Sequence, residues 1–439
     1  MKPPCSALPF LVTALAAATA AAQERPLYDE SLVQHLAALS SPGFEAKPDI
    51  SHDRLTLHFA SDQPGGLGDL DLWVAQRADP ASPFGPQANV SELNSAFRDH
   101  TPTTDASGTF MVFSSDRPGG AGTDDAWSAT RADAASAWNA PVHVPGINSS
   151  DRDMGFSMTP DGLVLYFTSN RSGGAGGFDL YRTSRADTSA PWDPPLPVAE
   201  LNTPFEDKFP SVTGDDRVLF FASDRPGSEL NPTGLLTSLD LWVAMRPQAD
   251  APWSVVENVF ELNTTYSEYL MSVADDGSEL FFVSDRPGTL GFFDLYRAPA
   301  IPGVARYGAA TPGTAGAPRL RPIGGAPTVG NGAWAYEISH VASSAFGLLA
   351  HASGPAAGPI LVTLDPTLPP TVFQDAFAPN PAPEVPRVVG LPIPADAALV
   401  GMSVFTQAGM LGDVLGQGVL PGPLPFAASP ALRQVVLAP

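Results

Sequence analysis

The sequence predicts an all-β protein built mainly from copies of one small unit. Proline (48 residues) and glycine (40 residues) make up about a fifth of the 439 residues, which suits many short strands joined by turns and few long helices. A Ser-Asp-Arg-Pro-Gly-Gly element, seen in FSSDRPGGAGTDDAW at 113–127, occurs with small changes in five copies. Each copy follows a run of strand-forming residues, and the copies are evenly spaced.

The spacing identifies a repeat. The second residue of the element falls at Asp62, Asp116, Asn170, Asp224 and Asp285, in steps of 54, 54, 54 and 61 residues. Two further markers follow the same period. They are the aspartate of an Asp-Leu-Trp/Tyr element, at Asp71, Asp125, Asp179, Asp240 and Asp294, and an aliphatic residue at Leu93, Ile147, Leu201 and Leu262. An insertion around 228–238 lengthens one step. Markers held in register in this way indicate a repeat architecture.

Each unit divides into four short strands. In the second unit we expect strands at 101–105, 109–115, 124–131 and 138–146, where β-forming residues are bounded by turn residues. Four-stranded units in five copies predict the blades of a five-bladed β-propeller over residues 23–298.

The Ser-Asp-Arg-Pro-Gly-Gly element is predicted to close a hairpin loop. Asp116 can accept hydrogen bonds from backbone N–H groups two residues further on, and the glycines supply positive φ. Arg117 can lie against the aspartate of the Asp-Leu-Trp/Tyr element, Asp125. We therefore assign a structural role to Asp62, Asp116, Arg117, Arg171, Asp224, Arg225, Asp285 and Arg286, and to Asp71, Asp125, Asp179, Asp240 and Asp294.

These motifs resemble the WD40-like, TolB-type propeller repeat of exported bacterial proteins. The resemblance covers roughly residues 40–300. Mild departures are Gln63 in place of arginine, Asn170 in place of aspartate, and Asp-Asp-Ala-Trp in the second unit. The resemblance implies a propeller whose first strand in each blade lies next to the axis.

The fifth unit has no fourth strand of its own. Residues 32–43 (LVQHLAALSSPG) match the end of a fourth strand when they are shifted by 54 positions. We expect this N-terminal segment to complete the fifth blade and close the ring, which removes free edge strands. An open or six-bladed ring is the alternative.

One acidic residue precedes each expected first strand. These residues are Glu45, Asp99, Asp153, Asp207 and Glu268. With first strands at the axis, as the resemblance implies, they would surround one mouth of the central channel and could bind a ligand. We predict no cofactor, although a calcium ion is compatible with several oxygen ligands. The alternative is that each carboxylate caps its own blade or pairs with an arginine. His100, beside Asp99, is interpreted as a surface residue.

Residues 1–22 have the features of an export signal. Lys2 supplies a positive charge, residues 7–20 form an apolar core that is too short for a membrane span, and small residues precede Gln23. We expect a periplasmic, cell-surface or extracellular protein. The only cysteine is Cys5, so residues 23–439 contain no disulfide or thiolate metal site.

The net charge of the chain argues against polyanionic partners. Asp and Glu number 46 against 23 Lys and Arg, which gives a net charge of −23. A nucleic-acid backbone or an anionic membrane surface would be repelled. Basic peptides, neutral glycans and cations remain as candidate ligands.

The composition changes after residue 300. Residues 299–318 are rich in Gly, Ala, Pro and Thr and are predicted to be a linker. Apolar runs between 319 and 439 predict a small C-terminal β-sandwich-like domain. Part of it resembles a C-terminal module of other large exported bacterial proteins.

The predicted function is non-catalytic binding of a protein or glycan of the cell envelope. The chain lacks a zinc-protease His-Glu-x-x-His motif, a Gly-x-Ser-x-Gly nucleophile motif, a P-loop and a dinucleotide fingerprint. The alternative is a glycan-active hydrolase or lyase that uses carboxylates at the channel. Carboxylates specific to single blades would favour the enzyme, and five equivalent ones favour the binding protein.

Overall fold

The structure is a computed structural model that describes residues 24–228 and 239–307. Beyond 307 it describes only the strand segments 319–323, 335–339, 346–352, 387–390, 403–411, 426–428 and 431–435. The chain forms two compact units, Gln23–Pro302 on the one hand and Met1–Ala22 with Gly303–Pro439 on the other. The expected export signal at 1–22 lies outside the described residues.

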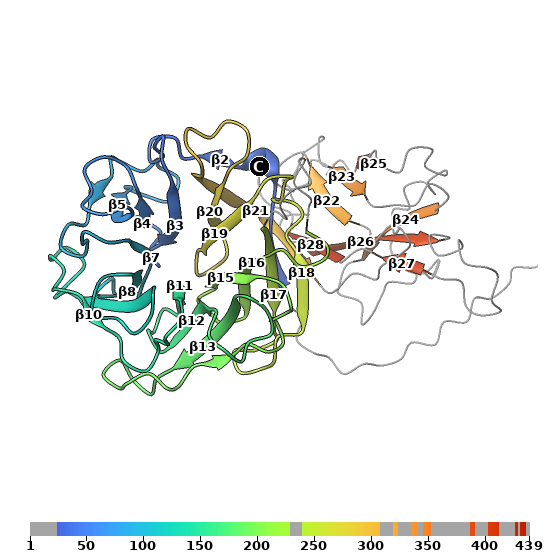
Figure 1. The fold of residues 1–439 in the computed structure, drawn as a ribbon. Coiled ribbons are helices and arrows are strands. Elements are labelled where there is room, and N and C mark those ends of the chain that lie inside the picture. The colour runs from blue at the N-terminus through green and yellow to red at the C-terminus, as the bar shows by residue number, and fades with distance from the viewer. Residues whose placement is uncertain are drawn as a thin grey trace, which may run out of the picture. The chain divides into compact units, whose positions relative to one another are not determined.

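The first unit is a five-bladed β-propeller, as predicted. Each blade begins with an inner strand, and Figure 1 shows these five strands gathered around the centre of the ring: β3 (Glu45–Ile50), β7 (Asp99–Thr104), β11 (Asp153–Met158), β15 (Asp207–Val212) and β19 (Glu268–Val273). The second strands are β4 (Thr56–Ser61), β8 (Phe110–Ser115), β12 (Val164–Ser169), β16 (Val218–Ser223) and β20 (Glu279–Ser284). The third strands are β5 (Asp71–Gln76), β9 (Asp125–Thr130), β13 (Asp179–Ser184), β17 (Asp240–Met245) and β21 (Asp294–Tyr307).

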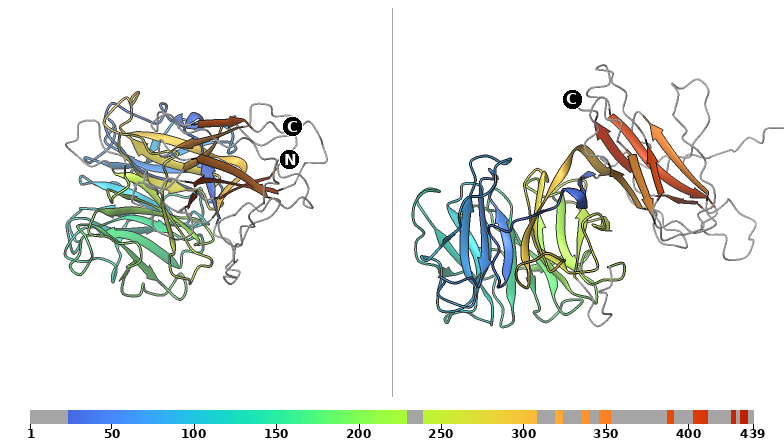
Figure 2. Two further views of the ribbon diagram at one scale, coloured as in Figure 1. Left: turned by 90° about the vertical axis from the view of Figure 1, so that its right-hand side faces the viewer. Right: turned by 90° about the horizontal axis from the view of Figure 1, so that it is seen from above.

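The outermost strands are short. They are β6 (Ala88–Asn89), β10 (Val142–His143), β14 (Leu196–Pro197) and β18 (Val255–Asn258), and all pairings within the blades are antiparallel. Seen edge-on, the strands run from one face of the ring to the other (Figure 2). All five inner strands therefore begin at the same face.

The N-terminal segment closes the ring, which confirms the prediction. After β1 (Glu24–Tyr28) and the 3-10 helix η1 (Glu30–Leu32), the strand β2 (Gln34–His35) pairs with β21, with His35 opposite Tyr296. Ser40 takes the place that an asparagine holds in the other blades, because its hydroxyl accepts a hydrogen bond from the backbone of Leu295 (3.3 Å). The fifth blade is thus built from both ends of the propeller, and open and six-bladed rings are excluded.

A belt of hydrogen bonds joins the inner strands around the axis. The fifth side chain of each inner strand accepts a hydrogen bond from the sixth backbone N–H of the next blade. The pairs are Asp49 with Thr104 (3.1 Å), Thr103 with Met158 (3.1 Å), Ser157 with Val212 (3.1 Å), Ser211 with Val273 (2.9 Å) and Ser272 with Ile50 (3.1 Å). The belt returns to its starting blade, so the ring is continuous at the level of hydrogen bonds as well as of strands.

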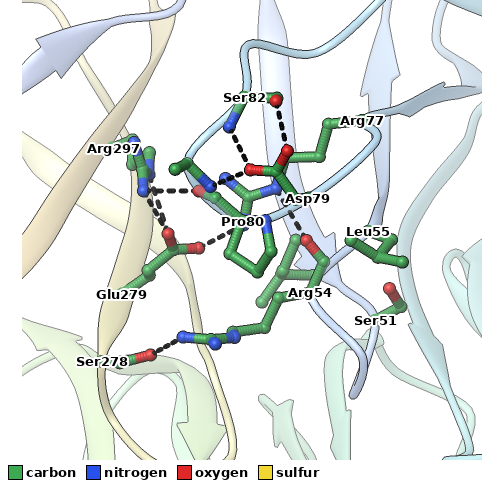
Figure 3. Close-up of polar contacts among 12 residues, drawn as sticks. Ser51, Arg54, Leu55, Arg77, Asp79, Pro80, Ser82, Ser278, Glu279 and Arg297 are labelled. Carbon is green, nitrogen blue, oxygen red and sulfur yellow. Dashed lines mark hydrogen bonds and ion pairs between the residues drawn. The ribbon is translucent and has the colours of Figure 1, made fainter.

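Charged side chains reinforce the seam between the first and fifth blades. Glu279 of β20 lies between Arg77, the residue directly after β5 (2.5 Å), and Arg297 of β21 (Figure 3). In the same view Arg54 donates to the hydroxyl of Ser278 (2.5 Å). The contacts of Arg77 with Glu279 and of Arg54 with Ser278 join the first blade to the fifth.

The last propeller strand is longer than expected. β21 continues to Tyr307, so residues 299–307, which were predicted to belong to a linker, are β-strand. The remainder of that segment, 308–318, lies outside the described residues.

The C-terminal unit contains two antiparallel sheets among its described residues. One has the order β22 (Arg319–Ile323), β23 (Ala335–Ser339), β25 (Arg387–Gly390). The other pairs the end of β21 with β28 (Ala431–Val435), followed by β26 (Ser403–Leu411) and β24 (Phe346–Ala352), with β27 (Phe426–Ala428) beside β26. In the part of the chain that the structure describes, no helix is long and apolar enough to cross a membrane.

Candidate functional site

The five repeated acids are the first residues of the inner strands, and all are fully buried. Four of them pair with the arginine of the Ser-Asp-Arg-Pro-Gly-Gly element in the same blade. The pairs are Asp99–Arg117 (2.5 Å), Asp153–Arg171 (2.5 Å), Asp207–Arg225 (2.5 Å) and Glu268–Arg286 (3.1 Å). We call this contact the acid–arginine clasp. Ligand binding by these five residues stays a prediction, and in the structure all five carboxyl groups are buried instead of facing open solvent.

Each clasp arginine lies between two aromatic rings. The guanidinium of Arg117 is 5.2 Å from the ring centres of both Phe113 and Trp127, and it also donates to the backbone carbonyl of Leu93 (2.5 Å). Leu93, Arg117 and Asp99 belong to three separate sequence markers. These markers recur at one spacing because, in each of these blades, their residues meet around the arginine of the clasp.

Two details of the predicted loop are wrong. The arginine does not meet the aspartate of the Asp-Leu-Trp/Tyr element. That aspartate accepts backbone N–H groups of its own loop, as Asp125 does from Gly122 (3.0 Å). Likewise Asp116 accepts from the backbone of Arg98 (2.8 Å), far upstream, while Ser115 accepts from the residue two positions on. Several carboxylates follow the same period, so the spacing alone could not identify the partner of each donor.

The first blade departs from this pattern. Gln63 stands where the other blades have arginine, and Glu45 accepts hydrogen bonds from the hydroxyls of Ser41 (2.6 Å) and Ser61 (2.9 Å). Both contacts use Oε1, and the buried Oε2 has no hydrogen-bond partner among the described residues. Burial raises the pKa of Glu45 to about 7, because its effect outweighs the hydrogen bonds from Ser41 and Ser61, which lower the pKa.

A pocket of about 400 Å³ opens beside these acids and is lined by all five blades. We call it the axial pocket. The residues that follow the acids contribute to it and differ from blade to blade: Ala46, His100, Met154, Lys208 and Tyr269. The residues that precede the third strands add Leu70, Phe178, Leu239 and Phe293. Here the repeat symmetry is broken, which is where a specific ligand site is expected.

One wall of the axial pocket is polar and is organised by Asp124. The carboxylate of Asp124 is fully buried and contacts His100 (3.1 Å), Arg98 (3.3 Å) and Arg152 (2.7 Å). Burial alone would raise the pKa of Asp124, but the hydrogen bond from His100 and the charges of the two arginines hold it down, to about 2. His100 is therefore buried in this cluster, and its interpretation as a surface residue is wrong.

A lysine completes the polar wall. Lys208 pairs with Glu206 (2.7 Å) and lies 4.4 Å above the ring of Phe178. Another part of the lining, the aromatic wall, consists of ring surfaces. Phe293 packs edge-on against Phe44 (5.5 Å between ring centres) and against Tyr269 (4.9 Å). The pocket therefore offers both charged donors and apolar ring surfaces to a ligand.

Large apolar side chains are exposed on the loops at the same end of the blades. Phe292 is 77% exposed, Leu67 60% and Leu290 55%. The inner strands start at this end too, because Glu45 pairs with Ser61 and Ser61 with Asp71 at the limits of the first three strands of the blade. Exposed apolar groups around a pocket are typical of an interaction surface.

A larger groove of about 670 Å³ runs between the third and fourth blades, away from the axis. It is lined by Pro194, Pro197 and Trp253, and its Arg246 is already bound to Asp216 (2.5 Å). The axial pocket is the better candidate because blade-specific polar groups converge there. Nowhere in the described part of the chain do three or more His, Cys, Asp or Glu side chains form a group that could hold a metal ion.

No family model and no curated protein matches this chain. Several solved structures can be superposed on part of this chain, all with low sequence identity and low TM-scores. One is a putative TolB from Agrobacterium tumefaciens, with 14% identity and a TM-score of 0.35, matched over 60% of this chain and 77% of that one. Another is TolB from Acinetobacter baumannii, with 14% identity and a TM-score of 0.35, matched over 64% of this chain and 65% of that one. A third is an endo-arabinase from Bacteroides thetaiotaomicron, with 12% identity and a TM-score of 0.41, matched over 60% of this chain and 96% of that one. The propeller fold rests on the strand pairing described above, and membership of the TolB-type repeat family stays a prediction.

Proposed function

We propose that this protein is an exported, non-catalytic β-propeller that binds a protein or glycan of the cell envelope in its axial pocket. One observation carries the proposal. The side chains that vary between blades, Arg98, Arg152, Lys208 and Tyr269, meet in this pocket, whereas the repeated acids are held inside their own blades. Export rests on the signal expected at residues 1–22.

The alternative is a glycan-active enzyme. A glycosidase of the usual kind needs two carboxyl groups at the substrate, and one of them must be protonated. At the polar wall Asp124 is held ionised by three cationic or hydrogen-bonding partners, and Glu206 pairs with Lys208. Glu45 has a raised pKa of about 7, but it is fully buried. This arrangement favours binding over hydrolysis.

The test is capture of envelope material by the immobilised full-length protein. Arg152→Ala and Lys208→Ala should each reduce capture strongly, since both side chains line the pocket. Arg217→Ala is the matched control, because Arg217 lies in the hairpin at the opposite end of its blade. Equal capture by all four proteins would contradict the proposal. Release of reducing ends from envelope glycans by the wild type, lost in Asp124→Asn, would favour the enzyme.

A further inference from the structure

The polar wall of the axial pocket has an excess of hydrogen-bond donors. Arg98 uses Nε on Asp116 (2.9 Å) and Nη2 on Asp124 (3.3 Å). Arg152 uses Nε and Nη2 on Asp124 (both 2.7 Å). Within residues 24–228 and 239–307, the Nη1 groups of the two arginines make no hydrogen bond or ion pair, and about a third of each side chain is exposed. Each guanidinium thus keeps donors that can reach a ligand.

The acceptors of this wall are largely occupied. Asp124 is fully buried, and both of its oxygens are already engaged, one by His100 and Arg98 and the other by Arg152. Lys208 keeps donors beyond its contact with Glu206, because an ammonium group has three. A ligand in contact with this wall must therefore supply acceptors. Paired guanidinium groups suit an oxyanion such as a carboxylate, whose two oxygens match their N–H groups.

The aromatic wall limits what can carry that carboxylate. Phe44, Phe293 and Tyr269 present ring surfaces, which favour an apolar or ring-shaped body. A peptide backbone would bring its own N–H donors, and those need acceptors that this wall lacks. Sugar hydroxyl groups can accept or donate, so a sugar meets a donor-rich wall without leaving unpaired groups.

We propose that the ligand unit of the axial pocket is an acidic sugar, with its carboxylate against Arg98 and Arg152 and its ring beside the aromatic wall. This inference rests on the proposed function and names its ligand class. It also differs from the expectation drawn from net charge. The net charge of −23 left basic peptides, neutral glycans and cations as candidate ligands, whereas the pocket concentrates two arginines and one of the chain's three lysines.

Calorimetric titration of the full-length protein tests the inference. The probes are short oligomers of galacturonate and of glucuronate, each compared with its fully methyl-esterified form. At least one acidic oligomer should bind, and esterification should weaken that binding tenfold or more. Lys208→Ala, which leaves the Asp124 cluster intact, and Arg152→Ala should each weaken it by a similar factor, with Arg217→Ala unchanged. Thermal unfolding checks that each variant is folded. Equal binding of the ester and the acid would overturn the inference.

A second measurement separates this inference from the proposed function. The carboxyl groups of the envelope material are blocked with a carbodiimide and an amine before capture. The inference predicts that capture is lost. Pocket-dependent capture that survives blocking, or that only an acidic peptide competes for, would overturn the acidic sugar while the binding function stands. Capture that is indifferent to the pocket variants would overturn both.

Discussion

Glu45 is the one repeated acid whose buried carboxyl group has no arginine partner among the described residues. In four blades a buried acid is neutralised by an arginine that lies between two aromatic rings. In the first blade Gln63 provides neither the charge nor the reach, and the carboxyl group of Glu45 keeps one buried oxygen without a hydrogen bond among the described residues. A buried acid without a counter-charge favours its protonated form, so the stability of this blade depends on pH.

Gln63→Arg should stabilise the protein in a pH-dependent manner. The pKa of Glu45 is raised to about 7 in the fold, so the stability linked to its protonated form is complete below the unfolded value near 4.5 and is lost as the pH rises through about 7. A guanidinium at position 63 would favour the ionised form and remove that loss. We expect a gain of about 1–3 kcal/mol in the free energy of unfolding at pH 8 and a smaller gain at pH 5, measured by urea unfolding.

The control for this prediction is Glu45→Gln, which removes the titrating group. Its stability should vary less with pH than that of the wild type between pH 5 and 8. A Gln63→Arg variant with the same gain at both pH values would show that packing of the new side chain, and not the charge of Glu45, is responsible.

At the residue scale the sequence located the important positions but not their partners. The acids, arginines and aliphatic markers were all found from their spacing. Every one of them follows the same period, so the spacing cannot tell whether Arg117 meets Asp99 or Asp125, and the structure selects Asp99. The Asp124 cluster was missed because it appears in one blade only. A signal existed in the change from Leu70 and Phe178 to a buried aspartate at that position.

The loop between the second and third strands is the element that holds each blade to its inner strand. In the second blade Asp116 joins them by accepting from the backbone of Arg98 (2.8 Å) and by pairing with its side chain (2.9 Å). Asp116→Ala should therefore lower the free energy of unfolding by about 1–3 kcal/mol, because a backbone donor loses its partner. Chemical denaturation measures the change.

Asp69→Ala is the control for this loop, since Asp69 is an exposed residue of the corresponding loop in the first blade. It should change stability by less than about 0.5 kcal/mol. Equal effects of the two variants would mean that loss of surface charge, and not of the loop contact, determines the result.

At the element scale the strands were predictable because their period and turn residues are local. The expected strands at 109–115 and 124–131 correspond to β8 and β9 within one residue at most ends. The outer strand at 138–146 was predicted far too long, since only Val142–His143 pairs in β10. An outermost strand has a partner on one side only, so most of its residues form loop despite their β-forming composition.

The whole molecule carries a large negative charge, and its buried acids raise the question of a cation. Four of the five repeated acids are already neutralised by arginine. We therefore expect that EDTA leaves the unfolding temperature unchanged and that millimolar calcium does not raise it, because a ligand stabilises only a state that binds it. Stoichiometric calcium binding by calorimetry that disappears in Asp153→Asn would contradict this.

The integrity of the whole ring depends on the N-terminal strand. Leu36 donates its backbone N–H to Leu295 (2.8 Å), and this bond extends the pairing of β2 with β21. Leu36→Pro removes that donor and disfavours the strand, whereas Leu36→Ala keeps the backbone bond and serves as the matched control. Because the ring is continuous, an exposed edge on β21 also weakens the contact between the fifth and first blades, which the ion pair of Arg77 with Glu279 spans. We expect Leu36→Pro to lower the unfolding temperature of the whole propeller in one transition, well beyond the effect of Leu36→Ala. Equal effects of the two substitutions, or a separate small transition for the fifth blade alone, would show that the ring does not depend on this closure.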